Sequence, residues 1–136
     1  MINVTAYEHT KDYVQISRWW TQRGLPPVAK ILVNVQGSIA YDESTGKMLA
    51  AGWLYKESEG NICWMTHIVT NPDCVGRQAY EGIKAVTNHL CESARAQGYG
   101  MVITATSLES LSGLYQKLGF IEDDSEKHTL LVKGLL

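Results

Sequence analysis

The stretch Ser107-Leu-Glu-Ser-Leu-Ser-Gly-Leu-Tyr-Gln-Lys-Leu-Gly-Phe120 decides the fold of this chain of 136 residues. Its apolar side chains recur at helical spacing and predict an amphipathic helix of about three turns. They are Leu108, Leu111, Leu114, Tyr115 and Leu118. Ser107 is the predicted N-cap, and Gly119 is the expected stop just after the last periodic residue. The apolar, β-branched run at residues 101–105 predicts a strand directly before this helix.

Residues 114–120, Leu-Tyr-Gln-Lys-Leu-Gly-Phe, resemble the aliphatic–Tyr–x–Lys–x–Gly–Phe signature of the GNAT superfamily, the acetyl-CoA-dependent N-acetyltransferases. The compact chain also resembles the small acetyltransferase-like proteins of phages and bacteria. The resemblance implies an α/β (α+β) fold, with one mixed, mostly antiparallel sheet of about six to seven strands flanked by about three helices. It further implies acetyl-CoA as co-substrate and an amine, on a small molecule or a protein, as acyl acceptor.

The predicted elements along the chain fit that fold. Strand patterns lie at 1–7, 31–41, 48–55, 62–70, 99–105, 120–122 and 128–133, and helical patterns lie between residue 10 and the stop at 24–27, at 75–97 and at 107–118. The second helix of the family is then missing or reduced to the turn at 26–27. Thr10 or Asp12 is the expected cap of the first helix. Trp20 is a predicted core residue, whereas Trp19 either packs in the core or lines a substrate entrance or a dimer contact.

Composition indicates one domain, residues 1–136, in a reducing cytoplasmic setting. Hydrophobic residues make up 45% and charged residues 19% of the chain, and the formal net charge is −2. That charge gives no electrostatic footprint for nucleic acid or a membrane surface. Neither a long apolar run nor a signal-peptide pattern is present. The three cysteines lack Cys-x-x-Cys spacing, which argues against a disulfide framework or a zinc site.

The resemblance implies a cofactor site between the central strand and the long helix. In the family, the pantetheine arm pairs with the backbone of the central strand, and the pyrophosphate lies on the N-terminus of the long helix. The corresponding strand residues are Ile68, Val69 and Thr70, and the corresponding phosphate-binding residues are Gly76, Arg77, Gln78 and Ala79. Free N–H groups and the helix dipole favour an anion at such a terminus.

The phosphate loop departs from the family pattern, Arg/Gln-x-x-Gly-x-Gly/Ala. Counted from Arg77, the first glycine position holds Tyr80 and the second holds Gly82. Glycine at these positions lets the backbone approach a pyrophosphate closely. A second interpretation is therefore that Arg77 and Gln78 only solvate the first turn of the helix.

Two residues are candidates for acid and base catalysis. Tyr115 matches the tyrosine that protonates the leaving CoA thiolate in many family members, although a buried tyrosine is the alternative. The central strand carries no carboxylate, and His67 is its titratable group with an ordinary pKa near 6.5. Either His67 or a water molecule is the expected base, and the alternative is a structural histidine. The family often has an asparagine at the position of Leu108, so Ser107 either contacts the pantetheine arm or only caps the helix.

Two functions therefore compete. The first is an acyl-CoA-dependent N-acyltransferase that works by direct attack of a primary amine on acetyl-CoA, without a metal. The second is a catalytically degenerate GNAT-fold protein that binds CoA or a partner protein. An exposed aromatic patch would favour the second, and its candidate members are Trp19, Trp53, Tyr55 and Trp64. Many relatives dimerise, so a homodimer is a further expectation.

Overall fold

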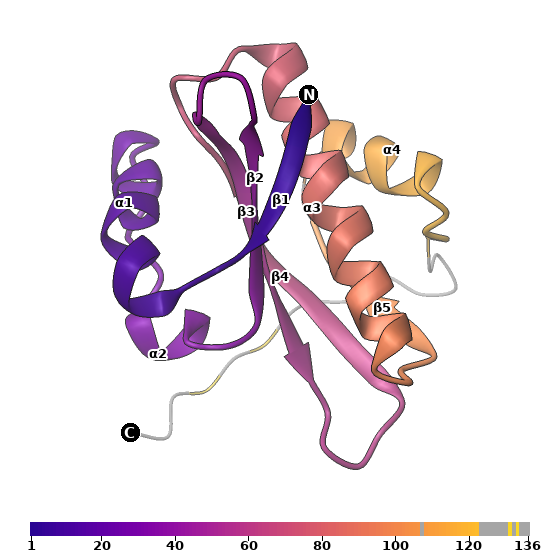
Figure 1. Ribbon diagram of the computed structural model, residues 1–136. Coiled ribbons are helices and arrows are strands. Elements are labelled where there is room, and N and C mark those ends of the chain that lie inside the picture. Colours follow the sequence, from indigo (N-terminus) through magenta and orange to yellow (C-terminus); the bar gives the residue numbers. More distant parts are fainter. Residues whose placement is uncertain (107, 123–130, 132, 134–136) are drawn as a thin grey trace. The chain divides into compact units, whose positions relative to one another are not determined.

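The computed structural model describes residues 1–106, 108–122, 131 and 133 (Figure 1). The chain divides into two compact units, Met1–Ala105 and Thr106–Leu136, and each is described by itself. Within the described residues, no helix is both long and apolar enough to span a bilayer.

The described residues contain five strands and four helices. In chain order they are β1 (Ile2–Ala6), α1 (His9–Gln22), α2 (Lys30–Val33), β2 (Gly37–Asp42), β3 (Met48–Lys56), β4 (Ile62–Thr70), α3 (Gly76–Ala96), β5 (Met101–Ile103) and α4 (Glu109–Lys117). The sheet has the order β1-β2-β3-β4-β5. Its first four strands are antiparallel and β5 is parallel to β4. The predicted mixed, mostly antiparallel sheet with flanking helices is thus confirmed.

The described sheet has fewer strands than the six to seven predicted. Residues 120–122 form no strand, and most of the predicted strand at 128–133 lies outside the described residues. The prediction was also wrong at 31–35, where the chain forms the one-turn helix α2. A short apolar run does not distinguish a strand from a buried helical turn by its periodicity. Here Val33 is buried while Ile31 and Leu32 are exposed, which is the pattern of a one-sided helical turn.

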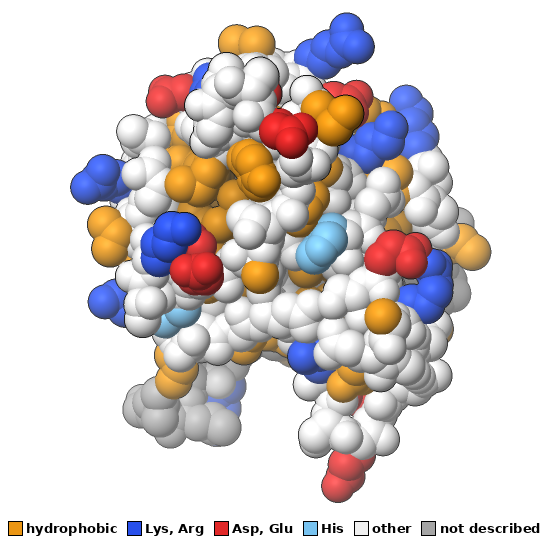
Figure 2. Space-filling model, in the orientation of Figure 1, with side chains coloured by type: hydrophobic (Ala, Val, Ile, Leu, Met, Phe, Trp, Pro, Cys, Tyr) orange, Lys and Arg blue, Asp and Glu red, His pale blue; other side chains and the backbone are white. Residues whose placement is uncertain are grey.

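In the first unit, α1 and α2 cover one face of the sheet and α3 covers the other (Figure 1). The core under α1 consists of Tyr7, Ile16, Trp19, Trp20, Val33, Ile39, Ala51, Trp53 and Val69. Its rim appears in Figure 2 as hydrophobic side chains between α1 and the β2–β3 hairpin. Trp19 and Trp53 are fully buried, so neither belongs to an exposed aromatic patch, and the alternative that Trp19 lines an entrance is wrong.

The helix termini differ from the predicted caps. Helix α1 has its N-cap at Glu8 rather than at Thr10 or Asp12. Asp12 is nevertheless buried and accepts a hydrogen bond from the Glu8 N–H at 2.8 Å. Helix α4 has its N-cap at Leu108, whose N–H donates to Thr106 Oγ1 at 3.1 Å. The predicted cap, Ser107, lies outside the described residues.

Candidate functional site

Strands β4 and β5 part after the first third of β4. They pair in parallel only from Ile62 opposite Met101 to Trp64 opposite Ile103. One further bond follows, from Thr104 Oγ1 to the Met65 carbonyl at 2.9 Å. Strand β4 then continues to Thr70, and among the described residues no strand pairs with this part of its edge. The N–H and C=O groups of an unpaired edge can bind an extended ligand.

A β-bulge lies in this unpaired part of β4. Ala51 pairs with Val69 and Trp53 pairs with Thr66, so two steps along β3 match three along β4. The extra residue lies between Thr66 and Val69 on β4. This segment contains His67, whose φ of 57° lies in the left-handed region. Such a conformation is uncommon for a residue other than glycine and recurs at functional sites. Bulges re-aim side chains and end regular pairing, which is what this part of the site requires.

The bulge directs His67 toward β3. Its Nε2 lies 3.3 Å from the hydroxyl of Tyr55, and the two rings meet edge to face with centroids 6.1 Å apart. Burial lowers the pKa of His67, because a charged imidazole would lose solvation there. The neutral form, which is the form a general base needs, therefore predominates at neutral pH.

Gly52 lies opposite the bulge, where side chains leave little room for a Cβ. A Cβ at Gly52 would lie 2.2 Å from Ile68 Cδ1 and 3.0 Å from Val86 Cγ1. Gly52 thus lets Ile68 pack over β3 against α3. Of the three predicted pantetheine-binding residues, Ile68 faces α3, and Val69 contributes to the core on the opposite face.

The N-terminus of α3 presents its backbone donors without a cap. Its N-cap is Val75, which makes no side-chain cap, and the first helical bond runs from the Ala79 N–H to the Val75 carbonyl at 3.2 Å. Among the described residues, the N–H groups of Gly76, Arg77 and Gln78 have no hydrogen-bond acceptor. The three donors and the helix dipole together favour an anion.

Asn71 holds the loop between β4 and α3 in place. This role was not predicted from the sequence. The Asn71 side chain donates to the Met48 carbonyl at 2.8 Å and accepts from the Asp73 N–H at 3.0 Å. Its own N–H donates to the Leu49 carbonyl at 2.9 Å, and its carbonyl accepts from the Cys74 N–H at 3.0 Å. The Asn-Pro-Asp sequence was the available signal, because asparagine bonds to the backbone two residues on in such turns.

Three cationic side chains belong to the same region. Arg23, just after α1, donates to the Thr70 carbonyl at 3.1 Å and also to Thr70 Oγ1. Lys47 donates to the Asp73 carbonyl at 3.1 Å, and Arg77 is exposed in the first turn of α3. The contacts of Arg23 and Lys47 cross 47 and 26 residues of sequence, so no local pattern could predict them.

The two positions where the family has glycines have structural explanations here. Tyr80 is 39% exposed and so does not join the buried face of α3. Gly82 packs on the sheet, where a Cβ would lie 2.9 Å from Leu49 Cβ and 3.2 Å from Ala50 Cβ. A Cβ at Gly76 would meet nothing within 4 Å, so the helix terminus is open at this residue.

The second unit contains Tyr115. Helix α4 ends at Lys117, and the predicted stop, Gly119, follows it with a φ of 100°; the Phe120 N–H donates to the Tyr115 carbonyl at 3.0 Å. The ring of Tyr115 lies 5.4 Å from that of Phe120, and its side chain is only 4% exposed. The role of Tyr115 at a CoA sulfur stays a prediction, as does that of Ser107.

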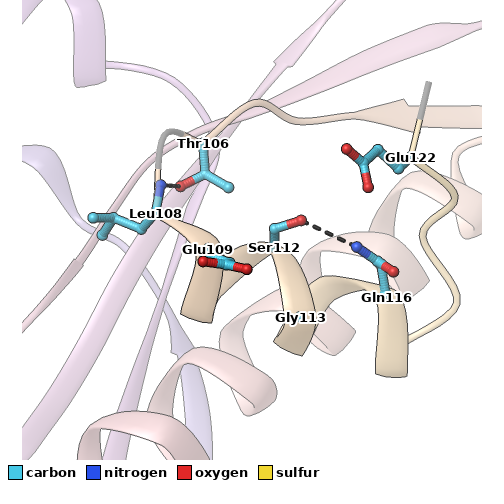
Figure 3. A pocket seen from close by; sticks show the side chains of 7 residues that line it. All are labelled: Thr106, Leu108, Glu109, Ser112, Gly113, Gln116 and Glu122. Atoms are coloured by element: carbon cyan, nitrogen blue, oxygen red, sulfur yellow. Dashed lines mark hydrogen bonds between the residues drawn. The ribbon is translucent and has the colours of Figure 1, made fainter. Parts of the chain in front are cut away.

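A polar pocket of about 440 Å³ lies beside α4 in the second unit (Figure 3). Its lining residues are Thr106, Leu108, Glu109, Ser112, Gly113, Gln116 and Glu122. Gln116 donates to Ser112 Oγ at 3.1 Å, and the carboxylates of Glu109 and Glu122 give the lining a negative charge. Among the residues that the structure describes, no group of three or more histidine, cysteine or acidic side chains is arranged to hold a metal.

Comparison with known proteins reveals the fold. No protein-family model and no curated protein matches the sequence. The glucosamine-6-phosphate N-acetyltransferase of Arabidopsis thaliana is 18% identical, with a TM-score of 0.66 over 99% of each chain. The ribosomal-protein-S18-alanine N-acetyltransferase of Escherichia coli is 18% identical, with a TM-score of 0.69 over 90% of this chain and 79% of that one. A predicted acetyltransferase of Clostridium acetobutylicum, solved with acetyl-CoA, is 15% identical, with a TM-score of 0.66 over 96% of each chain.

These neighbours are all acetyltransferases, and the similarity extends over nearly the whole of this chain. The chain therefore has the GNAT fold, as the motif at 114–120 predicted. At these identities the shared property is the fold, and a fold by itself does not fix a reaction.

Proposed function

We propose that the protein is an acyl-CoA-dependent N-acyltransferase that transfers an acetyl group from acetyl-CoA to a primary amine. The observation that supports this most is the unpaired edge of β4, which begins at the His67 bulge and ends a short loop before the uncapped N-terminus of α3. An extended arm and a terminal pyrophosphate need these two features next to each other.

In this proposal the pantetheine arm pairs with backbone groups of Ile68 and Val69. The Thr70 carbonyl already accepts a hydrogen bond from Arg23, so this carbonyl is less available to the cofactor. The pyrophosphate binds the N–H groups of Gly76, Arg77 and Gln78 and is attracted by the cations nearby. The fourth expected residue, Ala79, lines this turn, but its N–H already donates to the Val75 carbonyl. Ser107 is a proposed further contact to the arm.

The proposed reaction is a direct acyl transfer. His67 Nδ1 or a water molecule removes a proton from the acceptor ammonium, and the freed amine attacks the thioester carbonyl carbon. The C–N bond forms, the C–S bond breaks, and Tyr115 gives its proton to the departing thiolate. A route through an acyl-cysteine is less favourable, because burial raises the pKa of each cysteine thiol, Cys63, Cys74 and Cys91.

The acceptor is proposed to be an amine on either a small molecule or a protein. Two of the similar structures are named for their acceptors, which are a sugar phosphate in one case and a ribosomal protein in the other. We place the protein in the cytoplasm, with a homodimer as the expected assembly.

A second candidate function is binding of CoA or a partner protein without efficient catalysis. Trp64, on β4, is 41% exposed and is the member of the predicted aromatic patch that remains at the surface. The replacement of a phosphate-loop glycine by Tyr80 also favours this function. Trp64 alone is a small apolar area, so the enzyme is the proposal that we favour.

Calorimetric titration with acetyl-CoA tests the proposal. We expect micromolar binding by the wild type and at least about tenfold weaker binding by Arg77→Glu, because the substitution reverses a charge at the phosphate site. Lys84→Glu is the matched control, since Lys84 is exposed on the same helix two turns further on and its reversal changes the net charge equally. Absence of binding at millimolar acetyl-CoA by the folded wild type would refute the acyltransferase.

A further inference from the structure

The hydroxyl of Tyr55 lies between helix α2 and His67. Tyr55 belongs to β3, and its hydroxyl donates a hydrogen bond to the backbone carbonyl of Leu32 in α2. The same oxygen is 3.3 Å from Nε2 of His67. Burial raises the pKa of Tyr55, so the phenol keeps its proton at neutral pH.

The number of available protons fixes the direction of the second bond. A phenol has one proton, and the Leu32 carbonyl can only accept, so the proton of Tyr55 lies on the side of α2. The phenol oxygen therefore faces His67 with its lone pairs. A hydrogen bond then forms only if Nε2 of His67 carries a proton. In a neutral imidazole the other nitrogen, Nδ1, must hold the lone pair.

Nothing among the described residues occupies that second nitrogen. The hydrogen bond of His67 runs from Nε2, and Nδ1 has no donor or acceptor in the described part of the chain. The left-handed backbone at His67 keeps the ring beside Tyr55, because the bulge places His67 on the same side of the sheet as Thr66 and Tyr55.

We propose that Tyr55 is a positioning residue that holds His67 as the Nε2–H tautomer and so makes Nδ1 the basic nitrogen of the site. The role of Nδ1 as acceptor of the substrate proton rests on the proposed function, whereas the tautomer does not. When Nδ1 takes a proton from the acceptor ammonium, Nε2 keeps its own proton and its bond to Tyr55. The proton on Nδ1 then leaves to water, which restores the neutral ring.

Nitrogen-15 NMR of the histidine side chains tests the tautomer without any substrate. At pH 8 we expect the protonated-type shift at Nε2 and the unprotonated-type shift at Nδ1 of His67, with the signals assigned by their loss in His67→Gln. In Tyr55→Phe the Nε2–H form loses its acceptor. The ratio of the Nε2–H tautomer to the Nδ1–H tautomer should then fall roughly fivefold, which corresponds to the free energy of one ordinary hydrogen bond. Both nitrogens should then show averaged shifts.

Tyr13→Phe is the matched control. The hydroxyl of Tyr13 also donates to a backbone carbonyl, that of Val28 at 2.6 Å, but it does not contact His67. The His67 shifts should be the same in this variant as in the wild type. An unprotonated Nε2 in the wild type overturns the proposal without any variant, and unchanged His67 shifts in a folded Tyr55→Phe overturn it as well.

Kinetics separate this proposal from the proposed function. With acetyl-CoA and an accepted amine, Tyr55→Phe should lower kcat about fivefold while the KM for acetyl-CoA stays constant, because one hydrogen bond to the base is lost. If no amine is acetylated, the acyltransferase fails, yet the NMR result still decides the tautomer. If acetyl transfer proceeds and neutral His67 carries its proton on Nδ1, the acyltransferase proposal is supported and the proposed role of Tyr55 is refuted.

Discussion

Substitution of Gly52 by alanine should destabilise the protein by crowding the side chains of β4 and α3. The new Cβ would meet Ile68 Cδ1 at 2.2 Å, which is closer than real Cβ contacts allow, and Val86 Cγ1 at 3.0 Å, which is tighter than most of them. Overpacking of a tight core typically costs about 1–3 kcal/mol. With a urea m-value of about 1–3 kcal/mol/M, the unfolding midpoint of Gly52→Ala should fall by roughly 1 M.

The clash itself can be tested by a double-mutant cycle. Ile68→Val removes the Cδ1 atom that meets the new Cβ and alone costs about 0.5–1.5 kcal/mol. The double variant Gly52→Ala/Ile68→Val should therefore be more stable than the sum of the single changes predicts, by about 1 kcal/mol. Gly113→Ala is the control, because a Cβ there would meet nothing within 4 Å. An unchanged midpoint for Gly52→Ala, or strict additivity in the cycle, would refute the packing described here.

Three further predictions concern the bulge and the start of α1. His67→Gly should be more stable than His67→Ala by about 1 kcal/mol, because alanine cannot relieve the left-handed backbone at φ 57°; equal urea midpoints would contradict this. Burial places the folded pKa of His67 below its unfolded value of about 6.5. The free energy of unfolding should therefore have its full value above about pH 6.5 and decline as the pH falls through the folded pKa. The decline should be smaller in His67→Gln, as measured by urea unfolding at a series of pH values. Asp12→Ala should cost about 1 kcal/mol because the Glu8 N–H loses its acceptor, whereas Thr10→Ala should cost much less; the reverse order in thermal unfolding would restore Thr10 as the cap.

The general fold could be predicted from the sequence because its signals are local. The leucines and Tyr115 of α4 repeat at helical spacing, and Gly119 supplies the left-handed residue that ends the helix. The β2–β3 hairpin follows from the turn residues at 42–46. The run at 31–35 was misassigned because a short, mostly apolar run suits either a strand or a buried turn, and the outcome depended on tertiary contacts such as that of Tyr55 with Leu32.

The site could be predicted only in part. The strand end and the helix terminus that were expected to bind a cofactor came from the family resemblance, and the structure brings these two elements together in the first unit. The bulge at His67 has no sequence signature, since a histidine with positive φ looks like any other histidine. The bonds from Arg23 to Thr70 and from Tyr55 to His67 join different elements, so periodicity cannot reveal them.

The packing of Gly82 against Leu49 and Ala50 has a thermodynamic consequence for any anion at the start of α3. Together with the bonds of Asn71 to β3, this contact fixes the terminus against the sheet before a ligand arrives. A flexible glycine loop must lose conformational entropy when it closes around a phosphate, and that loss weakens binding. A rigid terminus avoids most of it. At the proposed phosphate site, the terminus beside Tyr80 would therefore be preorganised rather than adaptable. A heat-capacity change on binding no larger than rigid docking requires would be the calorimetric sign of this.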